Sequence, residues 1–207
     1  MRIGIDLDNT LIFYDDAFIN AARERGLIPR EFSGTKQQLR DRLREVPDMN
    51  GELEWQKLQG YVYGQGIHGA RLFGGVEEFF RGCRAKGGLH IVIISHKTEY
   101  GHYDPAHVNL HQAAREFLRK AGFFDRARIG LTEADLYFEG TRREKVARIA
   151  ALDCDVFIDD LPEVFEEPGF PAHTRRLLLT GSNAPVAHAT WESFANWCDI
   201  ARALLEN

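Results

Sequence analysis

The sequence predicts an α/β fold, with a doubly wound and mainly parallel sheet of five strands that carries a small α-helical insertion. Three observations lead to this prediction. Short apolar runs alternate with segments of helical period, one long interval contains no strand-like run, and acidic residues follow the ends of several strands. The length of 207 residues fits one domain with a modest insertion.

Five short runs rich in β-branched and aliphatic residues are the predicted strands. Most of them are continuously apolar rather than alternating, which is typical of strands that are covered on both faces. They are RIGID at 2–6, HIVIIS at 90–95, ARIGLT at 127–132, DVFIDD at 155–160 and RRLLLT at 175–180.

Four further segments place apolar residues at helical spacing, and we predict helices there. Helices that alternate with buried strands are typical of parallel, doubly wound sheets, because each crossover returns the chain to the same end of the sheet. The predicted helices cover residues 76–87, 108–123, 141–152 and 190–206.

The interval from residue 14 to residue 72 lacks any strand-like run. A helical crossover between parallel strands needs only about a dozen residues, so we interpret the interval as a helical insertion over the carboxyl edge of the sheet. The domain prediction is therefore a core of residues 1–13 and 73–207 with a helical domain of residues 14–72. Its amphipathic stretches are residues 15–26, 35–46 and 52–64, with Thr35 as an N-cap.

Composition narrows the classes of protein that fit. The net charge is −5 and no basic block is visible, which argues against a nucleic-acid partner. No apolar stretch approaches the roughly 18 residues of a membrane span, and no N-terminal signal is visible. Three scattered cysteines, Cys83, Cys154 and Cys198, fit free, buried side chains in a reducing compartment. We therefore expect a cytoplasmic protein; its oligomeric state is not indicated.

The residues that follow the predicted strands mark the expected site. In a doubly wound sheet, ligands bind outside the carboxyl ends of the strands, where the strand order reverses. Three strand ends and the start of one helix supply polar side chains there. These are Asp6, Asp8, Asn9 and Thr10 after the first strand, Ser95, His96, Lys97 and Thr98 after the second, Asp159 and Asp160 at the end of the fourth, and Lys145 from the helix before it.

The charge balance of these residues predicts a cation. Four carboxylates against Lys145 leave three negative charges, and two like charges ~4 Å apart repel by ~4 kcal/mol at an effective dielectric constant near 20. A hard divalent cation relieves this repulsion, and oxygen ligands without clustered cysteines favour Mg²⁺ over Zn²⁺. A cation, Lys145 and the Ser95 hydroxyl together form a receptor for a phosphoryl group.

The ordered set of Asp6-x-Asp8-x-Thr10, Ser95, Lys145 and Asp159-Asp160 resembles the haloacid dehalogenase (HAD) superfamily. The resemblance covers the sheet domain. It implies a Rossmann-like core with the first strand central between the second and the fourth, and it implies that the helical insertion is the family's cap.

The resemblance also implies roles for individual residues. Asp6 matches the nucleophile that becomes an aspartyl phosphate, and Asp8 matches the general acid and base. A second aspartate at this position favours phosphate chemistry over cleavage of a carbon–halogen bond. The implied ligands of Mg²⁺ are Asp6, Asp8 through its backbone carbonyl, and Asp159, with Asp160 in support. Ser95, Lys145, Asn9 and Thr10 are the implied phosphate-binding residues.

The leading hypothesis is a Mg²⁺-dependent phosphohydrolase acting on a small phosphorylated metabolite. A non-catalytic or regulatory protein of the same fold and a phosphomutase stay open as alternatives. A phosphonatase would need an amine from the insertion, for which Lys36 and Lys57 are candidates. A phospho-acceptor signalling module is disfavoured because the third predicted strand is not followed by an aspartate.

Two further groups of residues carry weaker predictions. The segment 95–111 contains four histidines and is predicted to be a loop at the rim of the site, with His96 and Lys97 as candidate substrate contacts. The alternative is a zinc site, because two of these histidines are spaced as on one helix face. Aromatic and arginine residues of the insertion are interpreted as core or as contacts to the leaving group: Trp55, Tyr61, Tyr63, Arg40 and Arg44.

Overall fold

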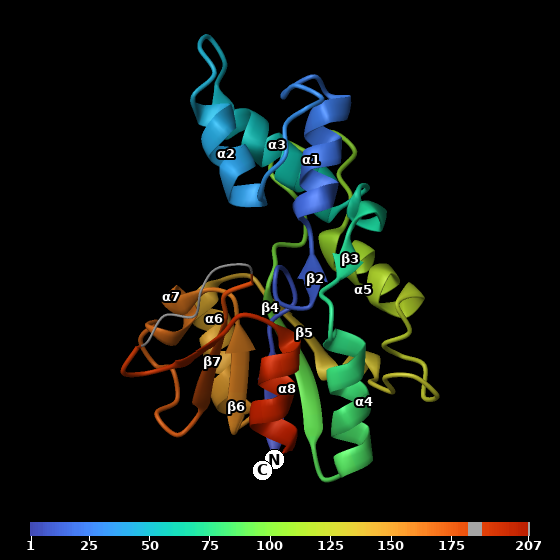
Figure 1. Cartoon of the computed structure of the whole chain (residues 1–207), viewed down its shortest axis with the longest axis vertical. Helices are drawn as coiled ribbons and strands as arrows, with labels where there is room; N and C mark the ends of the chain where they lie inside the picture. The colour runs from blue at the N-terminus through green and yellow to red at the C-terminus, as the bar shows by residue number, and fades with distance from the viewer. Residues whose placement is uncertain (182–187, 207) are drawn as a thin grey trace. The chain divides into compact units, whose positions relative to one another are not determined.

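A computed structural model describes residues 1–181 and 188–206 of the chain. Within these residues the main sheet has the strand order β5-β4-β1-β6-β7-β8, and every neighbouring pair is parallel (Figure 1). The prediction of a parallel α/β sheet with a central first strand is therefore confirmed. The strands are β1 (Arg2–Ile5), β4 (His90–His96), β5 (Leu136–Glu139), β6 (Val156–Asp159), β7 (Arg175–Leu179) and β8 (Glu192–Phe194).

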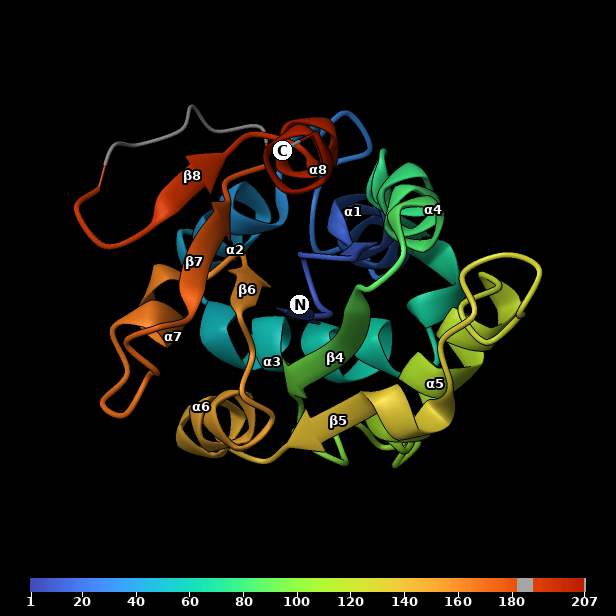
Figure 2. The same ribbon diagram turned by 90° about the horizontal axis from the view of Figure 1, so that it is seen from below.

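Helices cover both faces of this sheet, as a doubly wound fold requires (Figure 2). Helices α4 (Val76–Lys86) and α8 (Trp197–Leu205) lie together on one face, where the rings of Phe79 and Trp197 are 5.0 Å apart. Helices α6 (Arg142–Ala151) and α7 (Pro162–Phe165) cover the other face. A buried cluster joins this second face to the sheet and includes Val92, Ile94, Val146, Ile149, Phe157 and Val164.

Gly4 in the middle of β1 is required by close packing against β6. A Cβ atom at this position would lie 2.6 Å from the ring of Phe157 and 3.1 Å from Cys154 Sγ. The contact with Phe157 is too short for a real Cβ atom, so the glycine makes room for the Phe157 ring. The Phe157 ring of β6 therefore packs directly against the backbone of β1.

Two predicted elements are wrong. Residues 127–132 form turns rather than a strand, because Gly130 has a left-handed backbone at φ 81°, and the edge strand β5 follows it instead. The predicted helix 190–206 starts only at Trp197, because the Asn196 side chain caps it by accepting a hydrogen bond from Asp199 N–H. The residues before this cap form β8, a sixth strand that pairs with β7.

The chain divides into two compact units. Unit 1 comprises Met1–Ile12, Leu72–Lys97 and Arg119–Asn207, and unit 2 comprises Phe13–Arg71 and Thr98–Leu118. Residues 98–118, which the domain prediction grouped with the sheet, thus cluster with the helices. Two short strands, β2 (Ile12–Phe13) and β3 (Arg71–Leu72), pair where the chain passes between the units.

Unit 2 contains the three helices predicted for the insertion and the first part of a fourth. Thr35 is the N-cap of its second helix, and its side chain accepts a hydrogen bond from Gln38 N–H, as predicted. Phe18 stacks on Trp55 with ring centroids 4.9 Å apart, which makes Trp55 part of the core of this unit. The helices are α1 (Asp15–Glu24), α2 (Lys36–Arg44), α3 (Gly51–Tyr63) and α5 (Leu110–Lys120), with short 3₁₀ turns at Ile67–Gly69 here and Glu133–Asp135 in unit 1.

The three cysteines are free, and two of them match the sequence interpretation. Cys83 and Cys154 are buried, and burial raises the pKa of their thiols to about 12 and about 11. Cys198 is exposed, so the prediction of a buried side chain is wrong there. Across residues 1–181 and 188–206, every helix is too short or too polar to cross a lipid bilayer.

Candidate active site

The segment after β1 forms a tight turn that presents Asp6 and Asp8 at the carboxyl end of the sheet. The Asp6 N–H extends the ladder by donating to Ile158 O at 2.9 Å. The Leu7 carbonyl then accepts from both Leu11 N–H and Ile12 N–H, which closes the turn. Asn9 adopts φ 61° within it, a left-handed conformation that asparagine tolerates better than most residues.

A tryptophan from the last helix fixes this turn from below. The buried Trp197 indole donates from Nε1 to the backbone carbonyl of Thr10 at 2.9 Å, across 187 positions of sequence. Thr10 is itself fully buried. Since a buried carbonyl needs a partner, this bond holds the backbone of the turn in one position.

Lys145 reaches the same place from the first turn of α6. The Thr141 side chain caps this helix by accepting from Glu144 N–H, and the next residue points its ammonium at the sheet. Lys145 Nζ donates to Asp6 Oδ1 at 2.5 Å and to Asp159 Oδ2 at 2.6 Å. The ammonium also lies over the Phe157 ring, 5.5 Å from its centroid. The sheet, the helix and the aromatic ring thus place one cation between two carboxylates.

Asp159 and Asp160 complete an acidic cluster at the end of β6. Asp159 Oδ1 accepts from Leu161 N–H at 3.0 Å, and Asp160 Oδ1 accepts from the Thr10 hydroxyl at 3.2 Å. Carboxylate oxygens of Asp6, Asp159 and Asp160 lie within 4.8 Å of one another. Three hard oxygen donors without a thiolate are a donor set that suits a hard divalent cation.

Burial and neighbouring charges both shift the pKa values of Asp6 and Lys145. Burial raises the pKa of Asp6 to about 7, Lys145 opposes this shift, and the charges of Asp159 and Asp8 add to it. Burial lowers the pKa of Lys145, but the charges of Asp159 and Asp6 outweigh it and the net shift is upward. One ammonium therefore does not balance the carboxylates, which favours the uptake of a cation or of a proton at this place.

The end of β4 places Ser95 and His96 on opposite sides of the strand. Ser95 is buried, and its Oγ has no hydrogen-bond partner among the described residues. A buried hydroxyl without a partner costs free energy, so this atom is suited to a ligand that enters the site. His96 is exposed, with Nε2 3.1 Å from the carbonyl of Gly140. Burial lowers the pKa of its imidazole, the Gly140 carbonyl opposes this, and the nearby cations Lys145 and Arg142 lower it further.

Lys97 lies in an unexpected place. It is buried, and its Nζ donates to Asp8 Oδ2 at 2.7 Å. The charge balance drawn from the sequence counted only Lys145 against the four carboxylates and so missed this ion pair. Side chains two positions apart in a strand point to the same face. This rule places Lys97 on the same side as Ser95 and would have predicted a lysine at the site. With Lys97 paired to Asp8, the excess negative charge is confined to the acidic cluster.

The remaining candidates lie elsewhere. Within the described residues, the acidic cluster is the only group of three or more side chains that could hold a metal, so no zinc site forms from the histidines. His107 stacks on Tyr100, with ring centroids 4.1 Å apart. In unit 2, Lys36 donates to the Tyr63 hydroxyl at 2.6 Å, and Lys57 pairs with Glu54 at 2.7 Å. The other side chains also contact neighbours of their own unit: Arg25 over Tyr61, and Arg40 and Arg44 with Glu52.

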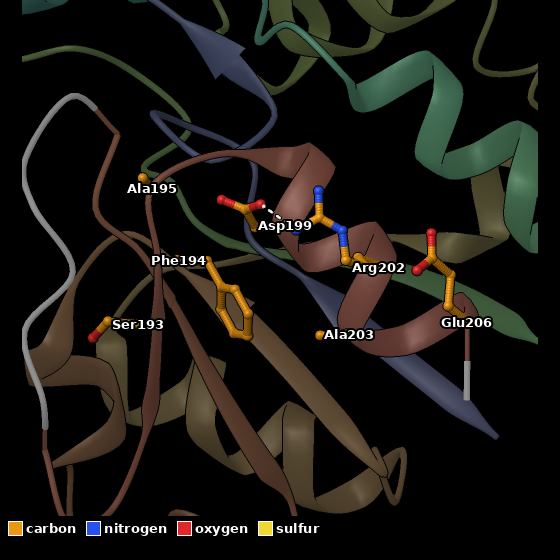
Figure 3. A pocket seen from close by; sticks show the side chains of 7 residues that line it. All are labelled: Ser193, Phe194, Ala195, Asp199, Arg202, Ala203 and Glu206. Atoms are coloured by element: carbon orange, nitrogen blue, oxygen red, sulfur yellow. Dashed lines mark hydrogen bonds and ion pairs between the residues drawn. The ribbon is translucent and has the colours of Figure 1, made fainter.

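An open hollow between β8 and α8 shares no residue with the acidic cluster (Figure 3). Its charged side chains are Asp199, Arg202 and Glu206, and Arg202 pairs with Asp199 at 3.2 Å. None of the residues predicted from the sequence lines it. The convergence of buried charge therefore singles out the end of β1 as the candidate active site.

Comparison with solved structures identifies the fold. One similar structure is a HAD family hydrolase from Deinococcus radiodurans with bound phosphate and sodium. The match covers 99% of this chain and 95% of the other chain, with a TM-score of 0.60 and 16% sequence identity. For a predicted phosphatase from Clostridium acetobutylicum, the match covers 100% of this chain and 98% of the other chain, with a TM-score of 0.56 and 14% sequence identity. For Protein Tyrosine Kinase A of Mycobacterium tuberculosis, the match covers 98% of this chain and 97% of the other chain, with a TM-score of 0.58 and 15% sequence identity.

These similarities define the class by architecture: the chain has the fold of the HAD-like hydrolases. No protein-family model and no curated protein sequence matches it. At such low identity the likeness extends to the fold alone, and one neighbour bears the name of a kinase.

Proposed function

We propose that this protein is a Mg²⁺-dependent phosphohydrolase that cleaves a small phosphomonoester through an aspartyl-phosphate intermediate. One observation carries the proposal. A buried aspartate at the end of the central strand shares one ammonium with a second buried carboxylate, and a hydroxyl without a partner among the described residues lies near the end of the neighbouring strand. This combination provides a nucleophile, local positive charge and a donor for a phosphoryl oxygen.

The first half of the proposed reaction transfers the phosphoryl group to the protein. A carboxylate oxygen of Asp6 attacks phosphorus, the bond from phosphorus to the leaving oxygen breaks, and Asp8 gives that oxygen a proton. Lys145 spends two of its three hydrogens on Asp6 and Asp159, so the third is free to meet a phosphoryl oxygen. The Ser95 hydroxyl donates to another.

The second half releases inorganic phosphate. A water molecule attacks phosphorus, Asp8 takes a proton from it, and the bond between phosphorus and the Asp6 oxygen breaks. Asp6, Asp159 and Asp160 are the residues that would hold Mg²⁺, with the Asp8 backbone carbonyl as the proposed fourth protein ligand. When bound, the ion supplies positive charge that stabilises the charge developed on the phosphoryl oxygens.

Unit 2 is proposed to be the cap that selects the leaving group. It lies outside the core motifs in sequence, and it combines an aromatic core with partly buried cationic side chains such as Lys36 and Arg40. These groups suit a polar organic leaving group rather than the phosphate itself.

A screen of phosphorylated metabolites for phosphate release tests the proposal. The wild-type protein should release phosphate from at least one member when MgCl₂ is present and not when EDTA replaces it. Asp6→Asn should reduce the rate to background, because an amide is a poor nucleophile. Asp153→Asn is the matched control, since Asp153 is exposed and its φ of 51° suits asparagine. Absence of hydrolysis across the whole panel would refute the proposal.

A further inference from the structure

The candidate site contains a second buried lysine, Lys97, which pairs with the other aspartate of the turn. The Lys97 side chain is 3% exposed and the Asp8 carboxylate 17% exposed. Burying an ammonium is costly unless a well-placed acceptor compensates for it. Lys97 Nζ has such an acceptor in Asp8 Oδ2 at 2.7 Å, across 89 positions of sequence.

The backbone of Lys97 is fixed as firmly as its side chain. Its N–H donates to Glu139 O at 3.0 Å, just beyond the register in which Ser95 pairs with Phe138 and His96 with Glu139. The ammonium therefore extends from a residue that continues the pairing of β4, an interior strand of the sheet, with β5. A group held in this way can impose an orientation on its partner.

We propose that Lys97 is a positioning residue for Asp8, an inference that rests on the proposed phosphohydrolase function. An ammonium group has hydrogens to donate and no lone pair to accept with. Asp8 Oδ2 must therefore act as an acceptor toward Lys97 in either protonation state of the carboxyl group. Because the carbonyl oxygen of a protonated carboxyl group is the better acceptor, the bond from Lys97 to Oδ2 favours Oδ1 as the oxygen that carries the proton to the leaving group and later takes one from water.

The inference gives Lys97 a role distinct from that of Lys145. Lys145 contacts the proposed nucleophile and a proposed metal ligand, whereas the contact of Lys97 that we describe is to the group that moves protons. Loss of Lys97 should therefore impair proton transfer more than phosphoryl binding. Proton transfer matters most when the leaving oxygen is strongly basic, and this dependence makes the two roles separable.

Aryl phosphates of graded leaving-group acidity test the inference. We compare phenyl, 4-nitrophenyl and 2,4-dinitrophenyl phosphate, in order of increasing acidity of the released phenol, and measure kcat/KM with MgCl₂ present. Lys97→Met should lower kcat/KM about 10–100-fold for phenyl phosphate, the loss expected for a residue that orients a catalytic group. The loss should shrink toward none for the dinitrophenyl ester, whose leaving group needs no proton.

Asp8→Asn should show the same trend with a larger loss, about 10²–10⁴-fold for the phenyl ester. If Lys97 acts through Asp8, adding Lys97→Met to Asp8→Asn should change the rate little. Lys97→Arg retains a donor and should recover part of the activity toward phenyl phosphate; it also serves if the methionine variant does not fold. Lys120→Met, at an exposed position, is the matched control.

The outcomes separate the two proposals. Wild-type protein that hydrolyses none of the three esters and none of the metabolite panel refutes the phosphohydrolase function, and the role of Lys97 with it. An active wild type combined with an equal loss for all three esters in Lys97→Met refutes the positioning role alone, since Lys97 would then support the phosphate site. Unchanged kinetics in Lys97→Met also refute it.

Discussion

Strand β1 has two neighbours in the sheet, and the two sides of its carboxyl end are built differently. On the β6 side, Lys145 lies between Asp6 and Asp159, with Asp160 close by. On the β4 side, Lys97 lies against Asp8. Both lysines are buried, and all three ion pairs are short. They differ in the number of carboxylates that each ammonium has to balance.

Because of this difference, the two aspartates of one turn lie in different electrostatic surroundings. Three carboxylates against one ammonium leave an excess of negative charge, which a divalent cation or a proton must relieve. One carboxylate against one ammonium leaves no excess, so the β4 side does not call for a cation. Asp6 therefore belongs to the acidic cluster on the β6 side, and Asp8 belongs to the ion pair on the β4 side.

The largest expected effect comes from removing the ammonium on the β6 side. Lys145→Met leaves two carboxylates, 7% and 0% exposed, without their cation, and should lower the free energy of unfolding by about 3–5 kcal/mol. Lys97→Met should cost less, because Asp8 keeps some access to water. Urea unfolding of both variants without divalent cation measures the difference. Equal losses would contradict the asymmetry between the two sides.

The second expected effect is a pH-dependent stabilisation by Mg²⁺. Because the folded-state pKa of Asp6 is raised from 3.8 to about 7, its stabilising contribution is complete below pH ~4 and is lost as the pH rises through ~7. Mg²⁺ at 100 times its Kd should add about 2.7 kcal/mol, or roughly 5–10 °C in Tm. The increment should be larger at pH 8 than at pH 5, where a proton on Asp6 competes.

Thermal unfolding with MgCl₂ or EDTA at both pH values measures these increments. Asp159→Asn should abolish the Mg²⁺ increment, and Asp6→Asn should flatten the pH dependence of the cation-free protein. A Mg²⁺ increment that is the same at both pH values would argue against a cation bound by Asp6.

The smallest expected effect has the opposite sign. Ser95 Oγ is buried without a partner, so Ser95→Ala removes an unsatisfied hydroxyl and should raise the free energy of unfolding by up to ~1 kcal/mol. The same substitution should weaken phosphate release by removing a donor to the phosphoryl group. Urea unfolding and steady-state kinetics on one preparation test both effects. A clear loss of stability would mean that Ser95 has a structural partner.

The sequence predicted the buried strands of the sheet well, because each of them is a continuous apolar run. Continuous apolar runs predicted β1, β4, β6 and β7, and the strand order followed from the resemblance. The edge strands β5 and β8 were missed because both are short and mostly half-buried: the apolar run of LYFE stops at three residues, and ESF has one apolar residue. Gly130 and Asn196 were the local signals that should have ended the neighbouring predictions.

The candidate site was predictable to the extent that its residues follow strand ends. Asp6, Asp159, Lys145 and Ser95 were placed from motifs and from the rule for parallel sheets, and their burial and contacts now give those predictions a geometry. The ion pair between Lys97 and Asp8 was not foreseen, because the count of charges stopped at residues that the motifs named. The support of the turn by Trp197 spans almost the whole chain, and no local pattern encodes it.

Unit 2 is assembled from two separate stretches of chain, and this has a consequence for engineering and for sequence divergence. A Cβ atom on Gly101 would lie 2.6 Å from the Cα of Gly60, so the loop after β4 touches helix α3 backbone to backbone. Deleting residues 14–70 alone would strip the loop of its support, and exchanging the unit with a relative requires both stretches to move together. Homologous sequences that keep this contact should therefore keep glycine at both positions 60 and 101.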